Sequence, residues 1–160
     1  MKTTLVAGLL ALATGTPAIA QVMPADKYVA TAGASDLYER QSSQVVLETT
    51  QNARIKSFAT MMIADHGKST AAVKDAATRS KVTVPPPALT PLQTELVAEL
   101  RAEKGEARDA LYVAQQKSAH GQALAVQKAY AADGKAAALK AAAAEIVPVV
   151  EHHIEMLKTM

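Results

Sequence analysis

The feature that most constrains the fold is a run of residues at helical spacing near the middle of the chain. Ile55, Ala59, Met62, His66 and Val73 follow one another at intervals of three, four and seven residues, which places them on one face of an α-helix. Four of the five are apolar and suited to a core, but the fourth in order is a histidine. Because buried polar groups are normally hydrogen-bonded, this pattern predicts a helical core with a polar group inside it.

The composition extends the helical prediction to the whole chain. Hydrophobic residues make up 49% of the 160 residues, but aromatic residues make up only 3%, with one Phe and no Trp. Much of the apolar share is alanine, the strongest helix former, and few β-branched or aromatic runs compete with it. The length suits one domain with a single core. We therefore expect an all-α domain.

The first 20 residues have the pattern of a signal peptide. Lys2 supplies the positive charge, residues 5–12 a short apolar run, and residues 17–20 a small-residue cleavage site. Cleavage after Ala20 would leave residues 21–160 as the mature domain. No second apolar run is long enough for a transmembrane anchor. The sequence therefore predicts an exported, soluble periplasmic protein.

Charge and cysteine content exclude several classes of protein. The net charge of +2 includes Lys2, so the mature chain carries about +1, too small an excess to indicate nucleic acid or an anionic membrane as partner. The absence of cysteine excludes disulfides and thiolate sites. No nucleophile elbow, P-loop or dinucleotide fingerprint is present, so no enzyme class is indicated.

Periodicity and capping signals predict four long helices, at residues 27–50, 53–80, 106–132 and 135–158. Asp26 and Asn52 are the expected N-caps of the first two, Asp133-Gly134 ends the third, and Pro148 should kink the last. A short helix is expected to open at Thr90, as a capping box with Gln93, and to end before Gly105.

The connection between the second and third long helices decides the topology. Residues 82–87 contain three prolines and cannot be helical, and the whole connection, residues 82–104, is long enough to travel the length of a bundle. The sequence therefore predicts a ferritin-like four-helix bundle with one long crossover. Simple up-down-up-down order is the alternative.

Each long helix is expected to turn one candidate metal ligand inward: Glu39, His66, His120 and His153. His152 lies roughly 100° off the inner face of its helix. The inward face of the helix at residues 53–80 is the one described above. The inward faces predicted for the first, third and fourth long helices are, in that order, Ser35, Glu39, Ser42 and Val46; Asp109, Tyr112, Gln116, His120, Ala123 and Gln127; and Leu139, Ala142, Ile146, Val149, His153 and Leu157.

These four residues could meet at one level of the bundle. With the crossover, rises of about 1.5 Å per residue put them at heights of about 19, 22, 18 and 12 Å. Three imidazoles and one carboxylate suit a single Zn, Cu, Fe or Mn ion, with Asp109 and Tyr112 as partners that orient a histidine. The other interpretation is a buried polar network that fixes helix register. Asp65 is expected to be a solvated charge, and Met62 and Met156 to fill gaps in the core.

One absent motif argues against a di-iron centre. Ferritin-like di-iron proteins place Glu-x-x-His on two helices. Here the residues three positions before His66, His120 and His153 are Ile63, Lys117 and Val150. We therefore expect any metal cofactor to be a single ion.

Short motifs in a fixed order resemble a known family. They are Tyr38-Glu39, Gln41-Ser42-Ser43, residues 55–59, Met62, Asp65-His66, Arg108-Asp109-Ala110-Leu111-Tyr112, His120, Pro148 and His153. Over residues 26–157 the chain is similar to the exported, ferritin-like family called domain of unknown function 4142, whose members are often labelled outer membrane proteins. The resemblance implies a ferritin-like fold, with the family's usual histidines at His66, His120 and His153 and its acid of the first helix at Glu39. The family's usual Phe is Arg108 here, and no general activity is established for the family.

The sequence as a whole predicts an exported helical bundle that acts as a binding or stress-related module through one metal site in the middle of the bundle. A structural or interaction protein whose buried histidines only fix packing is one alternative, and a redox enzyme with a mononuclear metal is the other. The residues identify no partner and leave a homo-oligomer open.

Overall fold

The computed structural model describes residues 22–160 and contains five helices and no strand within that range. The helices are α1 (Ala25–Leu47), α2 (Ala53–Arg79), α3 (Pro91–Ala102), α4 (Gly105–Asp133) and α5 (Ala137–Lys158). The all-helical prediction is thus confirmed, and the predicted bounds of the long helices differ from these by at most three residues. The predicted signal peptide, residues 1–20, lies outside the described residues.

Local capping chemistry sets most of the helix ends. The Asn52 side chain accepts hydrogen bonds from the backbone N–H groups of Arg54 and Ile55, and Thr90 and Gln93 form the predicted capping box. Gly105 adopts a φ of 56°, a left-handed conformation that glycine adopts without strain, and so separates α3 from α4. The predicted Asp26 cap is wrong, because α1 begins after Pro24 and Asp26 lies in its first turn. There its negative charge interacts favourably with the positive end of the helix dipole.

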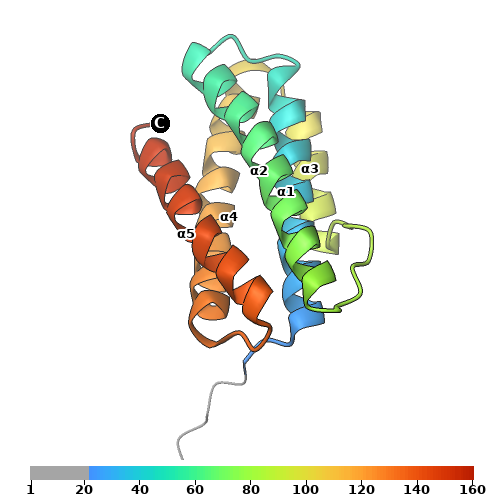
Figure 1. Ribbon diagram of the computed structural model, residues 1–160. Helices are drawn as coiled ribbons and strands as arrows, with labels where there is room; N and C mark the ends of the chain where they lie inside the picture. The colour runs from blue at the N-terminus through green and yellow to red at the C-terminus, as the bar shows by residue number, and fades with distance from the viewer. Residues whose placement is uncertain (1–21) are drawn as a thin grey trace, which may run out of the picture.

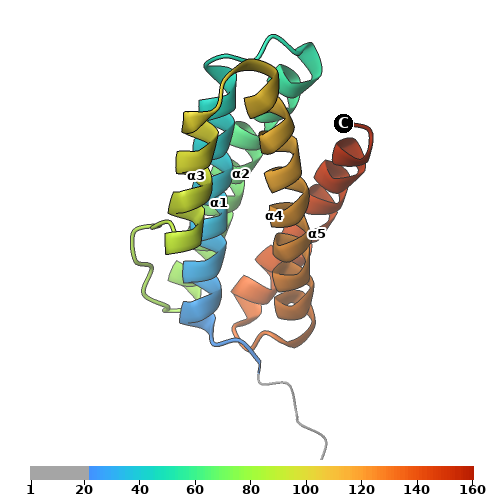
Figure 2. The same ribbon diagram turned by 180° about the vertical axis from the view of Figure 1, so that it is seen from behind.

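The long helices form two antiparallel pairs, α1 with α2 and α4 with α5 (Figures 1 and 2). The two pairs meet where α1 packs on α4 and where α2 packs on α5. In Figure 1, α1 and α5 run upward, whereas α2 and α4 run downward. The chain returns between α2 and α4 through residues 80–90 and α3, which packs outside α1 and α4. Within residues 22–160, no helix combines the length and apolar character needed to cross a membrane.

Two apolar clusters fill the interior on either side of its middle. One surrounds the stacked rings of Tyr28 and Tyr130, whose centroids are 3.9 Å apart, and includes Val73 and Leu139. The other surrounds Phe58. The polar side chains described below lie between the two, so apolar packing on both sides holds them in place.

The inner face of α5 differs from the predicted one at one position. Val149 is 40% exposed, whereas its neighbour Val150 is 2% exposed. The buried positions of this half of the helix are Ile146, Val150, His153 and Leu157, an alternation of four and three residues that stays on one face. The prediction was therefore wrong for Val149: of the two adjacent valines, Val150 is the one that lies on the buried face.

Arg108 anchors the α3–α4 turn to the end of α1. Its side chain is buried and donates hydrogen bonds to the carbonyl oxygens of Val45 and Glu103, both at 2.7 Å, and to the Glu48 carboxylate at 3.0 Å. Carbonyls at a helix C-terminus have no partner within the helix and favour a positive charge. The arginine that departs from the resembled family's pattern is thus accommodated by hydrogen bonds.

We predict that Arg108→Ala destabilises the protein by about 3 kcal/mol, because it removes a buried guanidinium that donates hydrogen bonds to two carbonyl oxygens and one carboxylate. The free energy of unfolding in urea measures this loss. Arg101→Ala, which removes an exposed arginine from the same turn, is the matched control and should cost less than about 0.5 kcal/mol. Equal stabilities for the two variants would show that Arg108 is not an anchor.

Candidate metal centre

Four buried titratable side chains, one from each long helix, come together in the middle of the fold. They are Glu39 on α1, His66 on α2, His120 on α4 and His153 on α5, and each is at most 5% exposed. Each continues the apolar face of its helix, as His66 follows Met62 on α2 and His153 follows Val150 on α5. The fold thus brings together Glu39, His66 and His120, which helix depth had put at one level, and adds His153 to them.

The three imidazoles form a tight group. One ring nitrogen from each of His66, His120 and His153 lies within 4.8 Å of the other two, and the ring centroids are 5.3–5.7 Å apart. Around one tetrahedral ion with bonds of about 2.05 Å, nitrogens lie roughly 3.3 Å apart. Small movements of the side chains would therefore let all three rings bind the same ion.

Glu39 lies beside this group. Its Oε1 is 3.7 Å from Nδ1 of His120, and neither carboxylate oxygen has a hydrogen-bond partner. It is not part of the mutually close set that the three histidines form. The structure therefore gives a histidine triad with a buried carboxylate at its edge.

Each histidine has one ring nitrogen occupied by a protein acceptor. Nδ1 of His66 is 2.8 Å from Oδ1 of Asp36, Nδ1 of His120 is 3.0 Å from the Gln116 carbonyl oxygen, and Nε2 of His153 is 3.3 Å from Oδ2 of Asp65. A nitrogen that faces an acceptor carries the proton, so in the neutral ring the other nitrogen holds a free lone pair. These contacts select the tautomer and orient each ring, as partners of metal-binding histidines do.

The remaining nitrogens have no partner in the protein. Nε2 of His66, Nε2 of His120 and Nδ1 of His153 are buried without a hydrogen bond, as are both oxygens of Glu39. These five are more than half of the nine such atoms found among residues 22–160. Since buried polar atoms are rarely unpaired, their concentration at one point indicates a site for a bound group.

Burial controls the charge of the group. Together with the nearby charge of His66, it lowers the pKa of His120 to about 3 and that of His153 to about 4. At neutral pH these two rings are uncharged, which is the form that binds metals. Burial also raises the pKa of Glu39 to about 7, although the positive charge of His66 opposes this.

His66 behaves differently because it has a carboxylate partner. Burial acts to lower its pKa, but the hydrogen bond to Asp36 and the charge of Glu39 outweigh that effect, and the net shift is upward. His66 and Glu39 are therefore the two groups that would hold a proton near neutral pH when no cation is present. A metal ion would replace those protons and supply the positive charge that the site otherwise takes from them.

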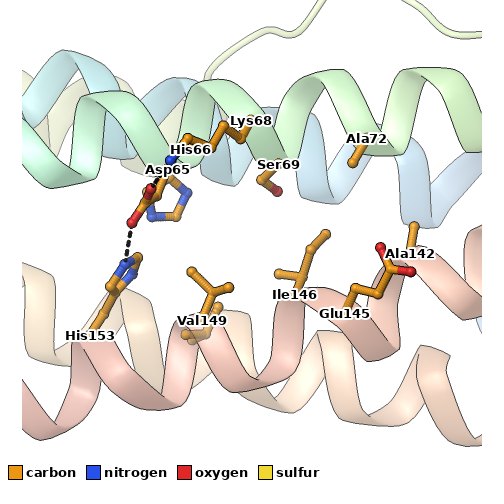
Figure 3. Close-up of a pocket in the computed structure, with 11 residues that line it drawn as sticks. Asp65, His66, Lys68, Ser69, Ala72, Ala142, Glu145, Ile146, Val149 and His153 are labelled. Carbon is orange, nitrogen blue, oxygen red and sulfur yellow. Dashed lines mark hydrogen bonds and ion pairs between the residues drawn. The ribbon is translucent and has the colours of Figure 1, made fainter.

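The site is bordered by an aromatic ring on one side and by a cleft on another. Phe58 lies against it on one side, with its ring centroid 6.2 Å from that of His120 and 6.3 Å from that of His153. On another side a cleft of about 260 Å³ runs between α2 and α5, and its lining includes Asp65, His66 and His153. Figure 3 shows these three residues together at one end of the cleft. The cleft gives a route from solvent to the histidines.

The two expected orienting residues lie elsewhere. Oδ2 of Asp109 accepts a hydrogen bond from Thr50, and the hydroxyl of Tyr112 is 2.8 Å from that of Ser43. Among the hydrogen bonds of residues 22–160, neither pairs with a histidine. Asp109 precedes His120 by 11 residues, roughly 16 Å along α4, so the expectation failed because a shared helix face does not imply a shared level.

Asp36 and Asp65 contact the histidines although the sequence did not predict either contact. Asp36 is buried, and its spacing of three residues from Glu39 on α1 was a usable signal, because such residues share a helix face. Asp65 was expected to be a solvated charge, but it is only partly exposed and contacts His153 of α5 as well as Lys68. That contact depends on the packing of α2 against α5, which the sequence of α2 alone does not encode. The expectation that His152 lies off the inner face is confirmed, since His152 is exposed.

We predict that acidification destabilises the metal-free protein relative to His120→Asn. The pKa of His120 is about 3 in the fold against 6.5 normally, so its stabilising contribution is complete above pH 6.5 and is lost as the pH falls toward 3. At about pH 5 the free energy of unfolding of the wild type should have fallen by about 2 kcal/mol relative to the variant.

The wild type must be compared with a variant because Glu39 acts in the opposite direction. Its pKa is raised from 4.5 to about 7, so its contribution to stability increases as the pH falls from 7 to 4.5. That contribution is present in both proteins and cancels in the difference. Urea denaturation above pH 6.5 and at about pH 5, in the presence of a chelator, gives the difference in unfolding free energy between the wild type and each variant at both pH values. His152→Asn, at the exposed neighbour of His153, should leave the difference from wild type constant. A constant difference for His120→Asn as well would show that His120 is not buried as a neutral ring.

Comparison with known proteins supplies the family. No curated protein matches the sequence. A Streptomyces coelicolor protein of domain of unknown function 305, described as a secreted protein, has a solved structure that matches with a TM-score of 0.65 at 14% identity, over 84% of this chain and 88% of that one. At this identity the match shows a shared fold alone. The model of one family matches residues 11–160, and the chain therefore belongs to the family described as Domain of unknown function (DUF4142).

Proposed function

We propose that the protein is an exported, ferritin-like four-helix bundle that binds a single transition-metal ion between His66, His120 and His153, with Glu39 as fourth ligand. Two observations carry the proposal: these four residues hold five buried atoms without a hydrogen-bond partner, and one ring nitrogen of each histidine lies within 4.8 Å of the other two. The bundle consists of α1, α2, α4 and α5, and α3 belongs to the crossover. Export rests on the signal-peptide pattern of residues 1–20, with cleavage after Ala20.

The chemistry of the donors favours Zn²⁺ or Cu²⁺. Imidazole suits Zn, Cu, Fe and Ni, and among divalent ions affinity is usually highest for Cu²⁺, with Zn²⁺ also tightly bound. A thiolate cannot contribute, since the chain has no cysteine. An iron pair would need several bridging carboxylates, and Glu39 is the one carboxylate here whose oxygens are both unpaired. One ion therefore fits the donor set better than two.

The hydrogen bonds around the rings support the same role. The Thr70 hydroxyl lies 3.0 Å from Oδ2 of Asp36 and 2.8 Å from the His66 carbonyl oxygen, and its one proton is shared between these acceptors. It therefore links the carboxylate that faces His66 to the backbone of α2. A ring oriented in this way loses little freedom when it binds an ion. The cleft beside His66 and His153 leaves room for a water molecule or small ligand as a further ligand of the ion.

We expect the untagged, chelator-treated protein to bind one equivalent of Zn²⁺ or Cu²⁺ per chain in calorimetric titration. At a free concentration 100 times Kd, the ion should stabilise the fold by about 2.7 kcal/mol, and this rise should appear in thermal unfolding. His66→Ala should weaken binding by at least about 100-fold, because a ligand contributes more than an outer partner. His152→Ala, which removes the exposed histidine, should bind like the wild type.

A second prediction concerns the partner of His66. Asp36→Asn keeps all four proposed ligands but replaces the acceptor of the Nδ1 proton by a neutral amide. Metal affinity should fall by about 10- to 100-fold, while circular dichroism shows an unchanged helical content. Asp75→Asn, at an exposed aspartate of the same helix pair, is the control and should not alter the affinity.

A packing role for the histidines is the alternative, and the same hydrogen bonds are compatible with it. Each ring has one partner in the protein, so a network that fixes helix register is chemically reasonable. Sub-stoichiometric metal and no thermal stabilisation by added ions would support that role and contradict ours. A mononuclear redox enzyme would further require metal-dependent turnover of oxygen or peroxide that is lost in His66→Ala.

A further inference from the structure

The cleft between α2 and α5 has a lining that metal binding does not explain. Ala72 of α2 faces Ala142, Ile146 and Val149 of α5 across it (Figure 3), and Val150 also belongs to the lining. Val149 is one of two large hydrophobic side chains that stand exposed among residues 22–160. A route for water or for a metal ion has no need of aliphatic walls, so these side chains point to an organic ligand.

The size of the cleft limits that ligand. Its volume is about 260 Å³, and an apolar cavity of about 150 Å³ holds one benzene molecule. The space is therefore sufficient for one aromatic ring with a short chain, and too small for a lipid tail or a peptide of several residues.

The cleft has a carboxylate at each end, and within the described part of the chain only one of the two is paired with a cation. At the histidine end, Asp65 is paired with Lys68 at 2.9 Å and contacts His153 at 3.3 Å, so its charge is already compensated. At the other end, the carboxylate of Glu145 extends from α5 toward the cleft (Figure 3). No ion pair of residues 22–160 involves Glu145. Eight residues, roughly 12 Å of helix, separate Glu145 from His153.

We propose that this cleft binds a small organic cation, a primary amine whose apolar body is about the size of a phenyl ring with a short chain. The ammonium group pairs with Glu145, and the apolar body lies between Ala72 and the Ile146–Val149 wall, with its far end toward His66. Burial of the ring provides most of the affinity, and the exposed carboxylate provides the preference for a cation.

The proposed ligand is held by Glu145 and the aliphatic walls of the cleft, so its binding does not require the metal centre. The test therefore uses the mature protein after dialysis against a chelator, so that a failure of the metal proposal leaves the outcome unaffected. The probes are 2-phenylethylamine, 2-phenylethanol and 3-phenylpropionate, which share a phenyl ring and a two-carbon chain but differ in charge. NMR or calorimetric titration should show the amine binding about two- to fivefold more tightly than the alcohol, with the carboxylate weakest.

Two pairs of variants assign the effect to the cleft. Glu145→Gln should abolish the preference for the amine over the alcohol, whereas Glu151→Gln, at a carboxylate of α5 that pairs with Lys128, should retain it. Ala72→Leu should weaken both ligands by filling the cleft, whereas Ala71→Leu, at the exposed neighbour that does not line it, should not. Equal affinity for amine and alcohol, no binding of either, or binding that Ala72→Leu leaves unchanged would each overturn the proposal.

Discussion

The burial of four titratable side chains between two apolar clusters is the constraint on which the rest of the structure depends. Placing Glu39 and three imidazoles in a low-dielectric interior is unfavourable unless they are paired, and the protein pairs them only in part. Asp36, Gln116 and Asp65 occupy one nitrogen of each ring. The aromatic and aliphatic packing around Tyr28 on one side and Phe58 on the other holds the layer together.

This layer also connects the two halves of the molecule. The helices within each pair, α1 with α2 and α4 with α5, pack more extensively than the two pairs pack on each other. Glu39 and His66 belong to one pair, and His120 and His153 to the other. A metal ion bound to all four would therefore link the two pairs at their middle, beside the cleft that lies between α2 and α5. Metal binding, stability and access to the cleft would then depend on the same contact.

Much of the fold and part of the site could be predicted from the sequence. Helical spacing, the Asn52 cap and the Thr90–Gln93 box are local signals, and the structure contains each of them. Counting helical rises put Glu39, His66 and His120 at one level because straight helices have a constant rise. The distance of Asp109 from His120 follows from the same rise along α4. The contact of Asp65 with His153 and the exposure of Val149 were not predictable in this way. They depend on how helices rotate and slide against each other, which one sequence does not specify.

The central claim is that His66, His120 and His153 hold one metal ion. Anomalous diffraction from crystals of the untagged protein, loaded with Zn²⁺ or Cu²⁺ and measured at the absorption edge of that metal, tests this claim directly. Our account predicts one anomalous peak per chain, about 2.0–2.1 Å from Nε2 of His66, Nε2 of His120 and Nδ1 of His153. A map with no peak there, or with its peak at the exposed His152 instead, would contradict it.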